Sequence, residues 1–309
     1  MPKPIFVVGV HRSGTTWLAN ILIQHTKISG VLNKERFGIY ESAFFENIQD
    51  TFGNLEDENN FKKCIETFAL TDFFILSGID KSIFYKEQPK KYHELFRLLM
   101  DNIADRDNAN LWLEKTPIHT LYLKEISKYY PDANFVAIKR NVIDTVKSTI
   151  KMHYFDPKKN KFVKPNIAPI LYFTYRFVKY YKYIENFRRN SNSIMVIDYE
   201  QLKYSKEKVV SDICKFLEID YQPQMLEEKF KPNTSFNNNS ERKEILSDSD
   251  KKLITRIKPF FDIFPFRLYS IFNPIEKLIR KNKLPTWFYL ITEEKKIEED
   301  KKIDKEKLK

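Results

Sequence analysis

Cysteine is scarce in this chain, which holds only two, Cys64 and Cys214, among 309 residues. Two cysteines so far apart cannot build a disulfide framework for a chain of this size. No C-x-x-C pair occurs, so the patterns of zinc ribbons and of dithiol redox proteins are missing too. We therefore predict no metal site, and we expect both thiols to be inert core residues.

Long apolar runs are missing as well. No stretch reaches the roughly 18 consecutive apolar residues by which a membrane-spanning helix is recognised. The N-terminal apolar run, residues 5–9, is too short for a secretory signal and leads into a motif instead of a cleavage site. A cytoplasmic location is the resulting expectation.

Basic residues exceed acidic ones by 53 to 42, which gives a net charge of +11. Residues 293–309 do not add to this excess, because their acidic and basic residues balance and almost none is apolar. We expect one domain over residues 1–292 and a charged tail at 293–309, either disordered or a frayed helix. The basic charge fits nucleic acid, a membrane surface, an anionic ligand or simply a lysine-rich surface, so it decides nothing alone.

Short apolar segments alternate with helical patterns along the chain. Residues 5–8, 134–138 and 193–197 are predicted to be buried strands, and residues 111–113 a shorter one. Helices are predicted at residues 15–25, 61–77, 90–104, 119–129, 142–151, 169–189 and 205–217. This order predicts a P-loop-like three-layer α/β sandwich, with a central parallel sheet and helices on both faces.

The strongest motif is residues 9–16 (GVHRSGTT), which has two glycines with four residues between them and stands between a predicted strand and a predicted helix. Backbone amides of such a loop, together with the helix N-terminus, bind a phosphate. A nucleoside triphosphatase needs lysine at the position of Thr15. Arg12 stands inside the loop instead, so we predict binding of a 5'-phosphate by the amides and by Thr15 and Thr16, without magnesium triphosphate chemistry.

Residues 12–18 (RSGTTWL) resemble the 5'-phosphosulfate loop of sulfotransferases that use 3'-phosphoadenosine 5'-phosphosulfate (PAPS). The resemblance extends over roughly residues 4–240 and is nearest to the branch of tyrosylprotein and bacterial glycan sulfotransferases. It implies PAPS as the donor and no metal. The donor contacts that it implies come from Arg12, Ser13, Gly14, Thr15, Thr16 and Trp17.

A second anion site is implied by residues 135–148, which resemble the 3'-phosphate signature of the same family. Arg140 ends a predicted strand, and Ser148 follows eight residues later in the next helix. A guanidinium and a hydroxyl suit a phosphate dianion. Some relatives carry another arginine four residues past the serine, where this chain has Met152, so that part of the anchor is missing or replaced. Residues 197–202 resemble a strand-end segment that is mainly structural in the family.

The resemblance also implies catalytic groups. In this branch a glutamate downstream of the first helix acts as the base, and Glu41 is the leading candidate here, with Glu35 as the alternative. Lys115 lies in a segment, residues 114–117 (EKTP), that resembles the source of the family's catalytic lysine. Lys115 and Arg12 would stabilise the leaving phosphate during an in-line displacement.

Two other function classes remain open from the sequence. A P-loop kinase or NTPase fits the loop spacing but not Thr15. A non-enzymatic module that binds membrane surfaces fits the aromatic and basic residues of segment 258–291, which are also typical of core helices. An enzyme with peripheral membrane contact would combine both features. No nucleic acid partner is expected, and the acceptor can be a carbohydrate, a lipid-linked glycan or another alcohol.

Overall fold

The computed structural model describes residues 1–271 except for residues 34–37, 157–160, 163–165, 228 and 231–244. The predicted tail at 293–309 and the second half of segment 258–291 therefore lie outside the described residues. The helices are α1 (Thr15–Leu22), α2 (Phe44–Asn47), α3 (Glu58–Ala69), α4 (Asp72–Ser77), α5 (Ser82–Glu87), α6 (Tyr92–Arg106), α7 (Leu123–Tyr129), α8 (Val142–His153), α9 (Ile167–Arg188), α10 (Tyr199–Tyr204), α11 (Lys206–Phe216) and α12 (Asp248–Ile263), with 3-10 turns η1 (Pro117–Tyr122) and η2 (Pro223–Leu226).

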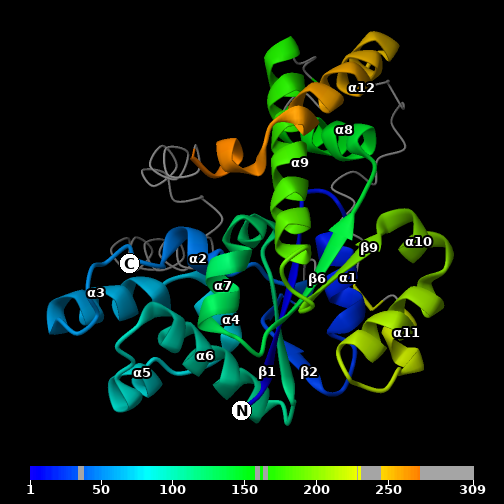
Figure 1. Ribbon diagram of the computed structural model, residues 1–309. Coiled ribbons are helices and arrows are strands. Elements are labelled where there is room, and N and C mark those ends of the chain that lie inside the picture. The colour runs from blue at the N-terminus through cyan, green and yellow to red at the C-terminus, as the bar shows by residue number, and fades with distance from the viewer. Residues whose placement is uncertain (34–37, 157–160, 163–165, 228, 231–244, 272–309) are drawn as a thin grey trace, which may run out of the picture.

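A five-stranded parallel sheet forms the centre of the molecule (Figure 1). Its strand order is β2 (Ile28–Gly30), β5 (Leu111–Lys115), β1 (Lys3–Gly9), β6 (Asn134–Lys139) and β9 (Ile194–Asp198). Every neighbouring pair is parallel. The central strands are buried on both faces, which explains their nearly continuous apolar sequence. Two small antiparallel pairs lie outside this sheet: β3 (Leu32–Asn33) with β4 (Gly38–Ile39), and β7 (Phe155–Asp156) with β8 (Lys161–Phe162).

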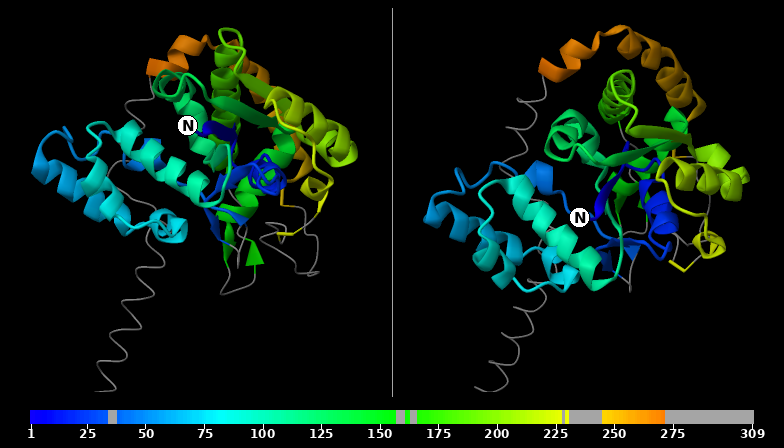
Figure 2. Two further views of the ribbon diagram at one scale, coloured as in Figure 1. Left: turned by 90° about the horizontal axis from the view of Figure 1, so that it is seen from below. Right: turned by 60° about the horizontal axis from the view of Figure 1, so that its bottom comes forward.

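Alternate residues of β1 point into two different cores. Phe6 lies in an aromatic core formed with α2 to α7, where its ring packs against Trp112 and Phe135. Ile5 and Val7 lie in an aliphatic core formed with α1, α10 and α11. Figures 1 and 2 show the two groups of helices on opposite sides of the sheet, so the predicted three-layer arrangement is confirmed.

Two predictions of local structure were wrong. The single helix expected at 61–77 is divided into α3 and α4, because the Thr71 hydroxyl accepts a hydrogen bond from the Phe74 amide and caps a new helix. The segment 27–60, in which neither a strand nor a helix was predicted, contains the edge strand β2. That strand has only three residues, Ile28–Gly30, which is too few for an alternating pattern to be recognised.

The longest described helix, α9, packs against α8 and α12 (Figure 1). In the described ranges, neither α9 nor any other helix is long and apolar enough to cross a bilayer. On and just beyond α12, Phe261 and Tyr269 pack against Tyr175 of α9, whereas Phe260 and Ile263 are exposed. The described part of segment 258–291 thus contributes both to a core and to the surface.

The edge of the sheet that carries the predicted site residues follows from its topology. The carboxyl ends of parallel strands meet at one edge, which is where open α/β sheets bind ligands. At this edge β1 leads into the glycine loop, β5 ends at Lys115, and β6 is followed by Arg140. Residues far apart in the sequence are thereby held at one edge by rigid elements.

The two cysteines provide a test of the fold. Both are buried, and burial raises the pKa of Cys64 to about 12 and that of Cys214 to about 11. We expect iodoacetamide at pH 8 to leave both thiols of the native protein unmodified, because almost no thiolate is present. Both should react fully in guanidinium chloride, as measured by intact mass. Rapid native labelling of either thiol would contradict this packing.

Candidate active site

The loop between β1 and α1 has the backbone geometry of an anion-binding turn. The Ser13 amide donates to the Val10 carbonyl at 3.0 Å, and Arg12 and Gly14 both have left-handed backbone conformations, with φ of 70° and 106°. Gly14 is the N-cap of α1, and no side chain caps the helix. The Ser13 hydroxyl is buried and has no hydrogen-bond partner among the described residues. The loop therefore offers donors to a ligand.

Glycine at position 14 is required by a neighbouring ring as well as by its φ. A Cβ on Gly14 would lie 2.7 Å from Cδ2 of Tyr199, at the start of α10. The Tyr199 ring also contacts Trp17 edge to face, with centroids 5.5 Å apart. Tyr199 thus supports the loop directly by packing against it.

The loop opens onto a cleft of about 740 Å³. This volume suits a nucleotide-sized ligand. The predicted residues that line it are Arg12, Gly14, Thr15, Thr16, Trp17, Glu41, Arg140 and Ser148. Ser13 and Lys115 are buried and lie behind the cleft wall.

Arg12 connects the two predicted anion sites. Its Nε donates a hydrogen bond to the Ser148 hydroxyl on α8 at 3.2 Å. Burial lowers the pKa of Arg12, and the positive charge of Arg140 lowers it further, while Glu41 opposes both effects. The glycine loop and the strand-end arginine therefore belong to one electrostatic unit.

Arg140 is held in place by three contacts. Its guanidinium donates to the Arg12 carbonyl at 3.2 Å and lies 4.3 Å from the Tyr199 ring centroid, and its amide donates to the Tyr181 hydroxyl at 2.9 Å. Its Nε is buried without a hydrogen-bond partner in the described part of the chain. A buried charged donor of this kind is expensive to leave unpaired, so the guanidinium is prepared for an anion.

Glu41 and Lys115 form an ion pair, with Oε1 2.5 Å from Nζ. The lysine side chain is 3% exposed and the glutamate 29% exposed. Only the carboxylate lines the cleft, while the ammonium approaches from the end of β5 behind it. The two leading catalytic candidates, 74 residues apart, are thus in direct contact. Glu35 lies outside the described residues.

Two further basic residues, His153 and Arg176, line the cleft. Burial lowers the pKa of His153, and the nearby Arg176 and Arg12 lower it further. The Nε of Arg176 is buried and has no hydrogen-bond partner within the described ranges. Arg176 was not predicted from the sequence, because an arginine in the middle of a tyrosine-rich helix shows no distinguishing pattern.

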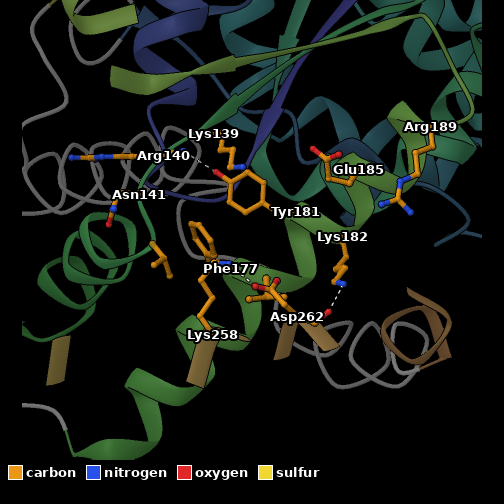
Figure 3. A pocket seen from close by; sticks show the side chains of 12 residues that line it. Lys139, Arg140, Asn141, Phe177, Tyr181, Lys182, Glu185, Arg189, Lys258 and Asp262 are labelled. Atoms are coloured by element: carbon orange, nitrogen blue, oxygen red, sulfur yellow. Dashed lines mark hydrogen bonds and ion pairs between the residues drawn. The ribbon is translucent and has the colours of Figure 1, made fainter. Parts of the chain in front are cut away.

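A second cleft, of about 420 Å³, lies between the end of β6, α9 and α12 (Figure 3). Lys258 forms an ion pair with Asp262, and Lys182 donates to the Asp262 carbonyl. Arg140 borders both clefts, but its guanidinium extends towards Arg12 and Tyr199. The second cleft contains none of the other predicted site residues.

The sulfotransferase family model matches residues 4–223, well over half of the sequence. The chain belongs to the sulfotransferase family. The expected enzyme class and the transfer of a sulfuryl group are thereby confirmed, while the match leaves the acceptor open. Comparison with curated proteins gave no match.

Comparison with solved structures found sulfotransferases that are similar to this chain. The sulfotransferase domain of the Synechococcus PCC 7002 olefin synthase is 14% identical, with a TM-score of 0.51 and coverage of 92% of this chain and 96% of that chain. The sulfotransferase domain from the curacin biosynthetic pathway is 18% identical, with a TM-score of 0.49 and coverage of 75% and 79%. A mouse sulfotransferase complexed with PAP is 14% identical, with a TM-score of 0.47 and coverage of 87% and 89%.

Gly14→Ala tests the loop geometry of this sulfotransferase. We expect a lower melting temperature and loss of nucleotide binding, because alanine adds left-handed strain and a contact with the Tyr199 ring. Gly78→Ala is the matched control, since Gly78 also has a positive φ but its Cβ would meet only a flexible arginine at 3.3 Å. The free energy of unfolding of the control should fall by about 1–2 kcal/mol, from backbone strain alone. Equal losses for both variants would contradict the role assigned to Tyr199.

Proposed function

We propose that the chain transfers the sulfuryl group of PAPS to a hydroxyl acceptor, with the donor bound in the 740 Å³ cleft. The observation that carries the proposal is the contact of Arg12 with both Ser148 and Arg140. The 5'-phosphosulfate would bind the loop amides, Arg12, Ser13, Gly14, Thr15 and Thr16, next to Trp17. The 3'-phosphate would bind Arg140 and Ser148.

Charge complementarity supports this assignment. The cleft lining contains more cationic than anionic side chains, and PAPS is a polyanion. The cations are Arg12, Arg140, Arg176, Lys206 and Lys229, and the anions are Glu41 and Glu227. A bound phosphate would offer Arg12 and Ser148 a charged acceptor in place of their mutual hydrogen bond and would relieve the repulsion between Arg12 and Arg140.

The Glu41–Lys115 pair supplies both charges that the reaction needs. The Glu41 carboxylate accepts the proton of the acceptor hydroxyl as the acceptor oxygen forms its bond to sulfur. The bond between sulfur and the bridging oxygen breaks, and its electron pair stays on the 5'-phosphate. Lys115 and Arg12 stabilise that negative charge. If Glu35 is the base instead, Glu41 keeps the role of orienting Lys115.

The kinase or NTPase alternative gains no support from the site. Thr15 occupies the position where that chemistry needs lysine, and the buried ammonium of Lys115 is paired with Glu41. We further propose that the catalytic domain extends over residues 1–292 in the cytoplasm. Contact with a membrane surface would then use the exposed Phe260 and Ile263 beside Lys258.

Transfer of labelled sulfate from PAPS into host extracts tests the function. Wild-type protein should label an acceptor, whereas Glu41→Gln should transfer about 10²–10⁴-fold more slowly, because the amide cannot accept the proton. Its affinity for PAP, the desulfated 3'-phosphoadenosine 5'-phosphate, should stay within a few-fold of wild type.

Glu46→Gln is the matched control, since Glu46 lies on the same segment but accepts its hydrogen bond from Tyr122. It should transfer at nearly the wild-type rate. Arg12→Ala and Arg140→Ala should both abolish transfer. A wild-type protein that binds magnesium ATP tightly and ignores PAP would overturn the proposal.

A further inference from the structure

A fully buried carboxylate lies directly behind the Glu41–Lys115 pair. Glu114 precedes Lys115 on β5 and is 1% exposed, and its Oε2 lies 2.8 Å from Nδ1 of His119, which is 0% exposed. The proposed reaction uses neither residue. Burying a carboxylate and an imidazole is costly, so their presence beside the reacting groups calls for a role.

Within the described residues, every polar contact of Glu114 leads to the segment that carries Glu41 or to the turn after β5. Its Oε1 accepts hydrogen bonds from the Ser42 hydroxyl at 2.8 Å, from the Ser42 amide at 3.3 Å and from the Thr116 hydroxyl at 2.5 Å. Burial alone would raise the pKa of Glu114, but the interactions with His119 and the hydrogen bonds outweigh it and hold the pKa below its usual value. Glu114 is therefore an ionised, fully bonded acceptor.

The other ring nitrogen of His119, Nε2, is bonded to the same segment, residues 42–45. The Phe45 amide donates to Nε2 at 3.4 Å, so Nε2 carries a lone pair and the ring hydrogen lies on Nδ1, facing Glu114. The Ala43 amide donates to the Thr116 hydroxyl at 3.1 Å. Three residues of segment 42–45 are thus bonded to the β5 end and η1.

The backbone of this segment would not adopt its conformation unaided. Ala43 has a φ of 45°, a left-handed conformation that is unfavourable for alanine. Phe44 and Phe45 then enter the aromatic core as the first residues of α2. Because Glu41 directly precedes the bonded residues, the position of its carboxylate depends on the strain at Ala43 being held.

We propose that Glu114 and His119 are positioning residues, which with Ser42 and Thr116 form a brace that fixes segment 42–45 so that Glu41 meets Lys115. This inference rests on the proposed function, which assigns the chemistry to Glu41 and Lys115. None of the four brace residues lines the cleft. It keeps the base and the leaving-group cation in register from two elements 74 residues apart.

Transfer kinetics of brace variants test the role. In Glu114→Gln and His119→Leu we expect PAP affinity within about threefold of wild type and transfer reduced roughly 10- to 100-fold, because small displacements of reacting groups are costly. His119→Asn should recover part of the rate, since its amide nitrogen can replace Nδ1 as donor to Glu114. Adding His119→Leu to Glu41→Gln should cause little further loss, because residues acting through one group are not additive.

Amide hydrogen exchange gives a second readout, which can be measured without knowing the sulfuryl acceptor. The amides of Ala43 and Phe45 should exchange slowly in wild type and clearly faster in His119→Leu. In His119→Asn the Ala43 amide should stay closer to wild type, whereas the Phe45 amide still lacks its Nε2 acceptor and should exchange faster. Cys214→Ala, a cavity variant in the opposite core, is the control for general destabilisation and should leave these amides protected.

The outcomes separate the brace from the proposed function. Wild-type transfer in brace variants, multiplying losses in the Glu41→Gln double variant, or unchanged exchange at Ala43 and Phe45 would each overturn the brace. Absence of PAP binding and of transfer in the wild type would instead remove the proposed function, and the exchange measurement would still decide whether the brace holds the segment.

Discussion

Two guanidinium groups of like charge, those of Arg12 and Arg140, are held within electrostatic reach of each other at the ends of adjacent parallel strands. The rest of the site depends on this constraint. Repulsion between the two groups is tolerated because the sheet fixes both backbones, and because the Arg140 guanidinium donates to the Arg12 carbonyl and lies over Tyr199. An anion relieves that repulsion, so the folded protein is preorganised for an anionic ligand.

Three further elements place the other proposed site residues around this cationic centre. Lys115 comes from the end of β5, Glu41 from the segment before α2, and Ser148 from α8. The strands and helices supply the rigidity, and the buried network at Glu114 connects the irregular segment to the sheet. In this arrangement the position of Glu41, the proposed base, depends on interior hydrogen bonds as much as on the cleft that it lines.

Much of the sheet and of the glycine loop (residues 9–16) was predictable, because the sequence patterns that indicate them are local. A β-branched run ending in glycine predicts a strand and a turn, and residues 9–16 carry the loop motif in consecutive positions. Arg140 and Ser148 are eight residues apart and share one strand–helix unit. Two features were missed, the strand β2 and the helix that begins after Thr71. The strand has only three residues, and the helix start depends on one capping hydrogen bond, so neither produces a periodic sequence pattern.

The remaining features of the site arise from contacts between distant segments. Glu41 meets Lys115 across 74 residues, and Tyr199 closes over Gly14 from the far side of the chain. Glu114 was visible only as the neighbour of Lys115, since nothing in the sequence shows that Ser42 and His119 converge on it. Such pairings depend on the assembled sheet and become apparent only in the folded structure.

Calorimetry with two ligands tests most directly whether Arg140 binds the 3'-phosphate of a single nucleotide. Affinities of wild-type and Arg140→Ala protein for PAP and for 5'-AMP, which lacks the 3'-phosphate, form a complete cycle. The account predicts that Arg140→Ala weakens PAP about 10- to 100-fold and leaves 5'-AMP nearly unchanged. Equal weakening of both ligands, or no affinity of the wild type for PAP, would contradict it.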